Sequence, residues 1–416
     1  MILVVGAGLA GLASAIRLQE AGLDWMLLEA SQHPGGRVRT EITAEGYRID
    51  RGFQVLLDSY PTARRLLDFE ALDPRYFQSG ALLSGESGWE RLLNPLHHSA
   101  FFLATALMRS FSLRQKISLG LLTLSQCLRS DESLLNSEAG RSALEEIRHW
   151  GLQGDALEKF LRPFFAGVFL DNDLGTDASV FRYDLKKFAL GKALLPAHGM
   201  GEIPRQLSTR LPSQRQRFGT AVRRLIRKNG MVGDVTGVEL LNGEIIESDH
   251  VILATDAESS CRLLGIRENR SWNQVSTFYF SGDHPLYEGG LLVLPEGKEV
   301  LVRHFTDLTN TAPEYAPPGK RLLSATVLNP PEGELSVRVK SEIAGLLPDF
   351  ESWSFLREVK IRRALPSQAP GFMALYPERR PVRNVWLTGD QVTHASIEAA
   401  LSSGIMIADE VMNCIR

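Results

Sequence analysis

A glycine-rich turn near the start of the chain constrains the fold more than any other feature of the sequence. The turn, Gly6-Ala7-Gly8-Leu9-Ala10-Gly11, follows an apolar run typical of a buried strand (Ile2–Val5) and precedes a helical pattern that ends near Gly22. A second apolar run, Trp25–Leu28, completes a strand–helix–strand unit, which implies a right-handed parallel crossover. In such turns the first glycine permits the tight bend, the second lets a pyrophosphate approach the backbone, and the third lets helix and strand pack closely. We therefore predict dinucleotide binding here, with a turn that serves packing alone as the alternative.

An acidic residue stands where a ribose would be bound. Glu29 ends the second predicted strand, close to the spacing of about 20 residues expected of a carboxylate that binds a ribose hydroxyl. We include its neighbour Ala30 in the predicted cofactor site. A carboxylate at this position disfavours a 2′-phosphate, so NADP is not expected. It does not distinguish NAD from the adenosine half of FAD.

A second glycine pair makes that distinction. Pro34-Gly35-Gly36-Arg37 comes just after Glu29. The two glycines expose backbone N–H groups, and Arg37 can add charge-assisted hydrogen bonds to phosphate. A plain NAD dehydrogenase does not need this second loop, so the pair favours FAD. The alternative is a surface turn with solvated arginines.

A third motif lies near the C-terminus. Leu387-Thr388-Gly389-Asp390 is a predicted strand followed by a turn, and a helix is predicted from about Ser396-Ile397 to Ile415. Asp390 could accept a hydrogen bond from a ribityl hydroxyl, while backbone N–H groups at the helix start could face the flavin ring. The alternative is that Asp390 caps its own helix.

These three motifs in this order resemble, almost end to end, the FAD-dependent amine oxidase and carotenoid desaturase superfamily, which includes protoporphyrinogen oxidases. Residues 195–201 resemble the entry to its middle nucleotide segment, although His198 replaces the usual first glycine. The resemblance implies that Val222 contacts adenine through its backbone. It also implies that Ala254, at the end of an apolar strand, closes this segment beside the cofactor.

Within the superfamily, the run 389–400 is most similar to the plant-type phytoene and zeta-carotene desaturases, with Ile397 and Ala399 at positions where those enzymes carry Met and Gly. The chain also resembles flavoenzymes that process hydroxysqualene in bacterial hopanoid synthesis. Amine oxidases tend to place a tyrosine near this motif. Here His394 and Ala395 occupy that neighbourhood, which weakens an amine substrate without excluding it.

We predict an α/β fold in which a Rossmann-like FAD-binding domain is interleaved with an α+β substrate-binding domain. The first comprises residues 1–60, 200–262 and 376–416, and the second comprises 61–199 and 263–375. Apolar residues recur mostly at helical spacing over 61–200 and mostly in strand-like alternation over 218–330. Asn242-Gly243 is typical of a hairpin turn.

The resemblance places the substrate over the flavin in the second domain and implies hydride transfer from a substrate C–H bond, a chemistry that the cofactor supplies. Apolar helices predicted at 92–128 and 157–170 could line a tunnel for a long isoprenoid. The candidate lining residues, each of which could equally be ordinary core, are Phe101, Phe102, Leu107, Met108, Phe164, Phe165 and Phe169.

Four polar residues are candidates for the chemistry. His394 follows the Gly-Asp turn, and its ordinary pKa near 6.5 suits proton transfer, although a structural histidine is the alternative. Arg162 could anchor a polar end of the substrate or form a salt bridge. Arg303 and His304 lie on a predicted strand whose alternation would let only one of them face the flavin.

The net charge and the cysteine spacing limit the classes of partner and ligand that we expect for this protein. The net charge of −3 gives no basic excess for nucleic acid, and the three cysteines have no metal-ligand spacing, so we expect neither nucleic acid nor a metal site. The first predicted strand begins at Ile2, so we expect no signal peptide and a cytoplasmic location. No apolar run is long enough to span a bilayer.

Membrane contact remains open. Residues 92–120 could lie on a membrane surface, with Arg109, Arg114 and Lys116 facing lipid headgroups, or these cations could simply be solvated.

The sequence as a whole favours FAD-dependent oxidation or isomerisation of a hydrophobic, isoprenoid- or carotenoid-like substrate. A protoporphyrinogen- or amine-oxidase-type flavoenzyme is the first alternative. A flavin- or lipid-binding protein without redox turnover is the second.

Overall fold

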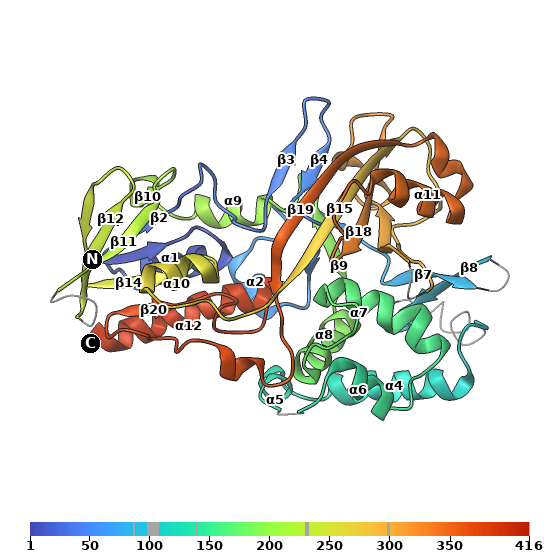
Figure 1. Cartoon of the computed structure of the whole chain (residues 1–416), viewed down its shortest axis with the longest axis horizontal. Helices are drawn as coiled ribbons and strands as arrows, with labels where there is room; N and C mark the ends of the chain where they lie inside the picture. Colours follow the sequence, from blue (N-terminus) through green and yellow to red (C-terminus); the bar gives the residue numbers. More distant parts are fainter. Residues whose placement is uncertain (86–87, 98–107, 138–139, 229–232, 298–299, 416) are drawn as a thin grey trace.

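The computed structural model describes residues 1–85, 88–97, 108–137, 140–228, 233–297 and 300–415. A five-stranded parallel sheet forms the left part of Figure 1, and both termini lie beside it. Its strand order is β10-β2-β1-β14-β20. These strands are β1 (Ile2–Val5), β2 (Trp25–Leu28), β10 (Gln216–Arg217), β14 (His250–Leu253) and β20 (Val385–Leu387). Segments far apart in the sequence therefore meet in one Rossmann-like sheet, which confirms the predicted fold class.

Two helices from opposite ends of the chain pack together beside this sheet. They are α1 (Leu9–Glu20) and α12 (Ile397–Ile415). The hydroxyl of Ser14 donates to the carbonyl oxygen of Gly404 over 2.9 Å. A Cβ atom built on Gly404 would lie 2.2 Å from the carbonyl oxygen of Ala10, so only glycine permits this close approach. The C-terminal helix is thereby fixed against the helix that follows the first glycine turn.

A small antiparallel sheet lies next to the nucleotide-type sheet. It contains β11 (Val222–Arg227), β12 (Val235–Leu240) and β13 (Ile245–Glu247). The predicted hairpin turn joins β12 to β13, and Gly243 adopts a φ of +87° there, in the region that glycine favours.

A seven-stranded sheet forms the upper right of Figure 1, in the order β19-β15-β18-β17-β16-β7-β8. Its strands are β7 (Gly80–Gly85), β8 (Gly88–Leu93), β15 (Trp272–Gly282), β16 (Leu292–Leu294), β17 (Val302–Asp307), β18 (Arg321–Leu328) and β19 (Ser354–Pro366). Helix α11 (Ser336–Leu346) packs on one face, over a core that includes Phe278, Phe305 and Trp353.

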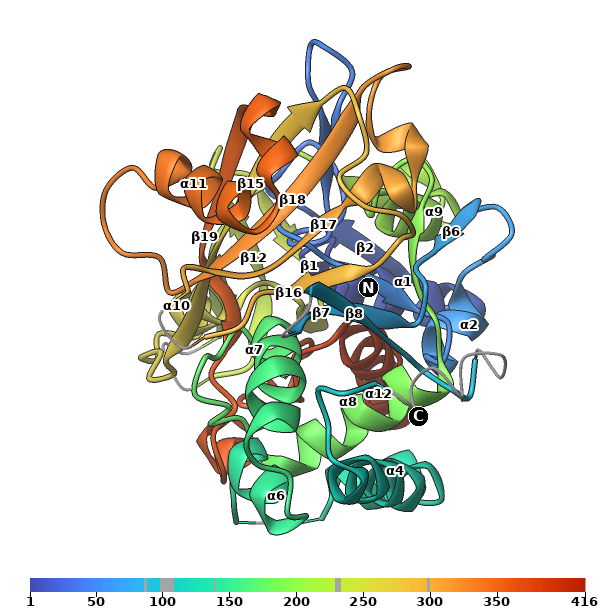
Figure 2. The same ribbon diagram turned by 90° about the vertical axis from the view of Figure 1, so that its right-hand side faces the viewer.

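A helical layer lies below this sheet in both views (Figures 1 and 2). It contains α4 (Leu113–Cys127), α5 (Asp131–Leu135), α6 (Ala143–His149), a π-helical turn (Ala156–Leu161), α7 (Arg162–Phe169) and α8 (Ala178–Leu190). Their apolar faces share a core around Phe165 and Phe181. None of the described helices is long and apolar enough to cross a membrane.

The helical interpretation of residues 61–200 is wrong in four places. Residues 74–76, 80–85, 88–93 and 193–196 are strands, so the helix predicted to begin at residue 92 is also wrong at its start. Short apolar runs do not distinguish a strand from a buried helix by periodicity. Strand β7 forms because it pairs in parallel with β16, from a segment about 200 residues later in the chain, as Leu82 opposite Val293 shows.

The remaining elements connect these layers. They are β3 (Thr40–Ile42), β4 (Arg48–Asp50), β5 (Leu56–Leu57), α2 (Pro61–Leu66), β6 (Pro74–Tyr76), β9 (Ala193–Pro196), α9 (Glu202–Thr209) and α10 (Ala257–Leu264). The sheets are distinct, but nothing in them tests where the predicted domain boundaries fall, so those boundaries stay predictions.

Candidate cofactor and substrate site

The three glycines of the first turn have different surroundings. Gly6 has a φ of +107°, and a Cβ atom there would lie 2.7 Å from the carbonyl oxygen of Ala254. A Cβ atom on Gly11 would lie 1.9 Å from the carbonyl oxygen of Gly6. A Cβ atom on Gly8 would meet nothing within 4 Å. The first and third glycines therefore serve close packing, while the second leaves open space at the start of α1, as a pyrophosphate cradle requires.

Glu29 closes one side of this turn. One carboxylate oxygen accepts from the backbone N–H of Ala7 over 2.6 Å, and the other accepts from the N–H of Ser31 over 2.8 Å. These bonds fix the carboxylate beside the turn. Each oxygen keeps a further lone pair with which it could accept from a ribose hydroxyl.

The second glycine loop lies directly against the first. The N–H of Gly35 donates to the carbonyl oxygen of Ala7 over 2.8 Å, and Gly35 forms a parallel bridge with Gly8. A Cβ atom on Gly36 would lie 3.8 Å from the Cα atom of Gly8. The two loops that the sequence separates thus expose their backbones at one place.

Arg37 joins these loops to the C-terminal turn. Its guanidinium forms an ion pair with the carboxylate of Asp390 over 2.5 Å and donates to the carbonyl oxygen of Ala364 over 3.0 Å. The Asp390 side chain is 8% exposed and that of Arg37 39% exposed. The alternative role for Asp390, as a helix cap, is wrong: the Ser396 hydroxyl accepts from the N–H of Ala399 over 2.9 Å and caps α12 instead.

Sequence reasoning missed the side chains that hold the C-terminal turn. The amide of Gln391 donates to the carbonyl oxygens of Leu253 and Thr388 over 3.0 and 2.8 Å. The hydroxyl of Ser403 accepts from the N–H of Gly389 over 3.0 Å. The signal was present, since Gln391 follows the Gly-Asp pair directly, but its partner Leu253 belongs to another strand.

Three other predicted cofactor residues lie in different elements: Ala254 just after β14, Val222 in the small antiparallel sheet and Ile397 in α12. The N–H of Ala254 donates to the carbonyl oxygen of Val5 over 2.8 Å, which places it behind the first turn. Val222 begins β11 and is buried, and Ile397 is the first residue of α12. Their contacts with a cofactor stay predictions.

His394 is buried and points toward the helical layer. Its ring makes an edge contact with Tyr183 of α8 at a centroid distance of 4.9 Å, and its Nε2 lies 3.3 Å from the Ser396 hydroxyl. Burial lowers the pKa of His394 to about 4, so the imidazole is neutral at pH 7. In that form it can accept a proton but carries no charge.

The two arginines proposed for the substrate are engaged by the protein. Arg162 forms an ion pair with Glu158 over 2.9 Å and donates to the carbonyl oxygen of Asn172 over 3.1 Å. Arg303 is buried, and burial together with the nearby Arg162 lowers its pKa. This arrangement favours the salt-bridge alternative for Arg162.

His304, the neighbour of Arg303, is the one that faces the nucleotide side. Its ring lies 5.3 Å from that of Phe53, and a Cβ atom on Gly167 of α7 would lie 2.5 Å from its Nδ1. Gln54, next to Phe53, donates to the carbonyl oxygen of Arg37 over 2.9 Å, which links this face to the second glycine loop.

The same sheet face carries further buried polar groups that the sequence did not single out. Thr326 stands opposite both His304 and Thr277 in the strand register. Within the described part of the chain, none of these three side chains has a hydrogen-bond partner for its buried polar atoms. Burial lowers the pKa of His304 to about 3.

Some of the residues predicted to line an apolar tunnel lie in the hydrophobic core, and the others lie outside the described residues. Met108, Phe165 and Phe169 are buried core residues, and Phe164 packs partly buried against that core. Phe101, Phe102 and Leu107 lie outside the described residues. The structure therefore favours ordinary packing for Met108, Phe165 and Phe169.

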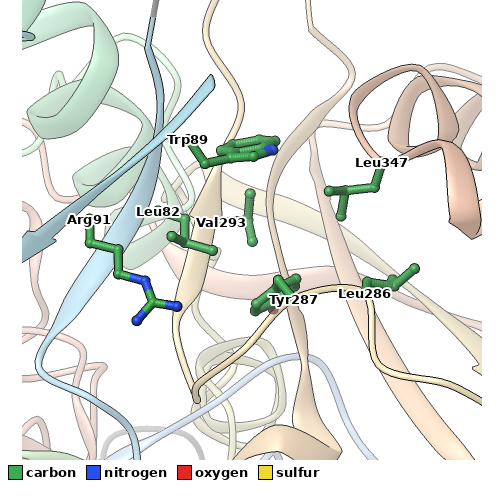
Figure 3. A pocket seen from close by; sticks show the side chains of 7 residues that line it. All are labelled: Leu82, Trp89, Arg91, Leu286, Tyr287, Val293 and Leu347. Carbon is green, nitrogen blue, oxygen red and sulfur yellow. The ribbon is translucent and has the colours of Figure 1, made fainter. Parts of the chain in front are cut away.

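A pocket of about 240 Å³ lies on the other face of the seven-stranded sheet (Figure 3). Its walls include Leu82, Trp89, Tyr287 and Val293. Val293 stands opposite Phe305, whereas His304 points to the opposite face because side chains alternate along a strand. This pocket is thus separated by the sheet from the glycine loops.

Metal ligation has no support among the described residues, which contain no cluster of three or more His, Cys, Asp or Glu side chains that could hold an ion. The chemistry of the site is that of a nucleotide cradle: open backbone at Gly8, the carboxylates of Glu29 and Asp390, and the guanidinium of Arg37 paired with Asp390.

Residues 9–412 match the family model described as flavin containing amine oxidoreductase, so the chain belongs to this family. It is an FAD-dependent oxidoreductase of the phytoene desaturase-like type. The open cradle at Gly8 and the paired carboxylate of Asp390 fit such a cofactor.

Several curated relatives are similar at low identity. A probable zeta-carotene desaturase from Synechococcus elongatus is 25% identical, over 97% of this chain and 96% of its own. A hydroxysqualene dehydroxylase from Rhodopseudomonas palustris is 27% identical, over 98% and 97%. A hydroxyneurosporene desaturase from Cereibacter sphaeroides is 29% identical, but the match spans only 61% of this chain and 56% of the relative.

Solved structures support the fold. An oxidoreductase from Methanosarcina mazei superposes with a TM-score of 0.70 at 19% identity, covering 98% of this chain and 99% of that one. At this identity the likeness shows the architecture alone.

Proposed function

We propose that this oxidoreductase holds FAD between its two glycine loops and its C-terminal turn and acts on a hydrophobic, isoprenoid- or carotenoid-like substrate. The observation that carries the proposal is the ion pair of Arg37 with Asp390, 2.5 Å long, beside the open backbone at Gly8. When bound, FAD supplies an acceptor for a hydride that leaves a substrate carbon. The named activities of the two relatives that align end to end support the substrate class.

The chain's own residues contribute positioning in this proposal. Backbone N–H groups at Gly8 and the start of α1 bind the pyrophosphate, and Glu29 binds a ribose hydroxyl. Asp390 accepts from the ribityl chain while it keeps Arg37 in place. The neutral imidazole of His394 can take up a proton lost by the substrate.

The test begins with the absorbance spectrum of the purified protein and chromatography of any nucleotide released by acid. FAD in the released fraction supports the cofactor, and a colourless protein that takes up no added FAD contradicts it. Anaerobic mixing with hydroxysqualene-type, carotene-type, porphyrinogen and amine substrates then follows. Bleaching of the flavin by an isoprenoid supports the substrate class, whereas bleaching only by an amine or a porphyrinogen would assign one of the alternatives.

A further inference from the structure

Helix α4 is amphipathic with its apolar side turned outward. Leu113, Ile117, Leu121, Leu124 and Leu128, which follows the helix directly, are exposed by 72, 54, 54, 56 and 80%. Their spacing of three and four residues places them on one face. The buried residues of the helix are Leu122 and the polar Gln126. This is the reverse of the pattern expected of a helix that packs on a protein core and faces water.

The helix lies at the periphery of the molecule. Figure 1 and Figure 2 both show α4 at the lower edge, with α7 and α8 of the same helical layer nearer the sheets. It contacts the rest of the chain chiefly through α8. The exposed stripe is therefore open to a large partner rather than enclosed.

Cations flank the stripe. Arg114 lies at one edge of it, since it is one residue from Leu113 on the helix, whereas the ammonium of Lys116 donates to the carbonyl oxygen of Met108 over 2.7 Å. Arg109 is exposed just before the helix. Residues 113–128 contain no Asp or Glu. An apolar face next to Arg109 and Arg114, on a helix without Asp or Glu, is complementary to a surface that is apolar beneath and negatively charged above.

We propose that α4 docks this protein on the surface of an anionic lipid membrane, with its leucine stripe in the acyl boundary and its cations at the headgroups. A second copy of the chain fits less well. A twofold contact of α4 with itself would bring the cations of both helices together without a compensating acid. The proposal does not depend on the identity of the substrate, although it would give the enzyme direct access to membrane-dissolved molecules.

The test is co-sedimentation of the full-length, FAD-loaded protein with vesicles of phosphatidylcholine alone and of phosphatidylcholine mixed with phosphatidylglycerol. We expect binding to the mixed vesicles that weakens as salt is raised. A variant with Leu113→Gln, Ile117→Gln, Leu121→Gln and Leu124→Gln should bind at least about tenfold less, because it loses most of the buried apolar area. Glutamine keeps the helix propensity of the original residues.

The matched control changes four apolar residues of similar exposure elsewhere: Ile42→Gln, Leu241→Gln, Ile245→Gln and Val337→Gln. It should bind vesicles as the unchanged protein does. The pair Arg109→Glu and Arg114→Glu should lower binding to the mixed vesicles about thirtyfold, at about 1 kcal/mol for each cation lost, and should not affect phosphatidylcholine vesicles.

Retained FAD and an unchanged circular dichroism spectrum show that a variant is folded. If the fourfold variant does not fold, the single variant Leu121→Trp is used instead and its tryptophan fluorescence is measured with and without vesicles. The fluorescence of the unchanged protein is subtracted as the background from the native tryptophans. The added fluorescence should shift to the blue and be quenched by brominated acyl chains.

The proposal is overturned if the unchanged protein does not sediment with mixed vesicles, or if the fourfold variant binds them normally. It is also overturned if the α4 changes alter only the oligomeric state. A Leu121→Trp variant whose added fluorescence does not change with vesicles would overturn the proposal as well.

Discussion

The cofactor loops and the sheet face around His304 are linked through Gln54, which donates to the carbonyl oxygen of Arg37, but they are built differently. The loops consist of backbone: Gly35 bonds to Ala7, and Gly8 is open. The sheet face carries side chains from three strands, with Gly167 of α7 packed against His304, and its buried polar atoms have no partner among the described residues. A pyrophosphate is recognised by backbone N–H groups in a local turn, whereas a substrate wall requires distant strands to pair first.

Because the two regions differ in this way, different kinds of substitution should affect them. At Gly6 and Gly11 a single added methyl group meets backbone that cannot move aside, whereas at Gly8 it meets open space. On the sheet face a change of polarity matters more than a change of volume, because the groups there are desolvated without compensation.

The largest effect is expected from Gly11→Ala. The new Cβ atom would lie 1.9 Å from the carbonyl oxygen of Gly6, so the turn or the helix must shift. Overpacking of this kind costs about 3 kcal/mol of stability. Thermal unfolding without added FAD measures it. Gly120→Ala, on the open side of α4, is the control and should be neutral or stabilising.

A pH-dependent effect of similar size is expected from His394. Its pKa is lowered to about 4 in the folded chain from the ordinary 6.5, so the unfolded chain binds more protons between these values. Stability due to this residue is therefore complete above pH 6.5 and is lost as the pH falls toward 4. The loss is about 3 kcal/mol at most. The free energies of unfolding of the unchanged protein and of His394→Gln, measured with denaturant, should differ more at pH 7 than at pH 4.5.

The same variant series tests chemistry at this position. His394→Ala should lower turnover while FAD stays bound, if the imidazole takes up a proton. Unchanged turnover in a folded, FAD-loaded variant would show that His394 serves only to pack against Tyr183 and has no role in the reaction.

A smaller and more selective effect is expected from Gly8→Ala. The added methyl group meets nothing in the described part of the protein, and the φ of −71° suits alanine, so unfolding without FAD should change by only a few tenths of a kcal/mol. FAD affinity should nevertheless fall about tenfold, because the methyl group occupies the approach of the pyrophosphate. A fluorescence titration of the apoprotein measures this. Equal affinity would mean that the cofactor does not pass over Gly8.

The smallest effect is expected from Thr326→Val. The hydroxyl of Thr326 is buried without a partner among the described residues, so an isosteric methyl group should be neutral or stabilising by up to about 1 kcal/mol. The measurement is chemical denaturation together with steady-state kinetics. A rise in KM without a loss of stability would show that this hydroxyl meets the substrate, and would bring the sheet face into the catalytic site.

The sequence by itself determined the parts that depend on short-range geometry. The strand–turn–helix unit from Ile2 to Glu20, the hairpin at Gly243 and the strand before Gly389 all form where the pattern predicts them. Their residues carry conformational requirements, such as the positive φ at Gly6, that act over a few positions.

Strand pairing over long distances, side-chain partners and the orientation of α4 depend on the tertiary structure. The helical interpretation missed β7 because its parallel partner β16 lies far along the chain, and it missed β8 because that strand forms by pairing with β7. The partner of Asp390 proved to be Arg37, and the leucine stripe of α4 proved to face outward, because neither choice is encoded at the residue itself. Side-chain periodicity predicts that one face of a helix is apolar, but the packing of the whole chain determines which way that face points.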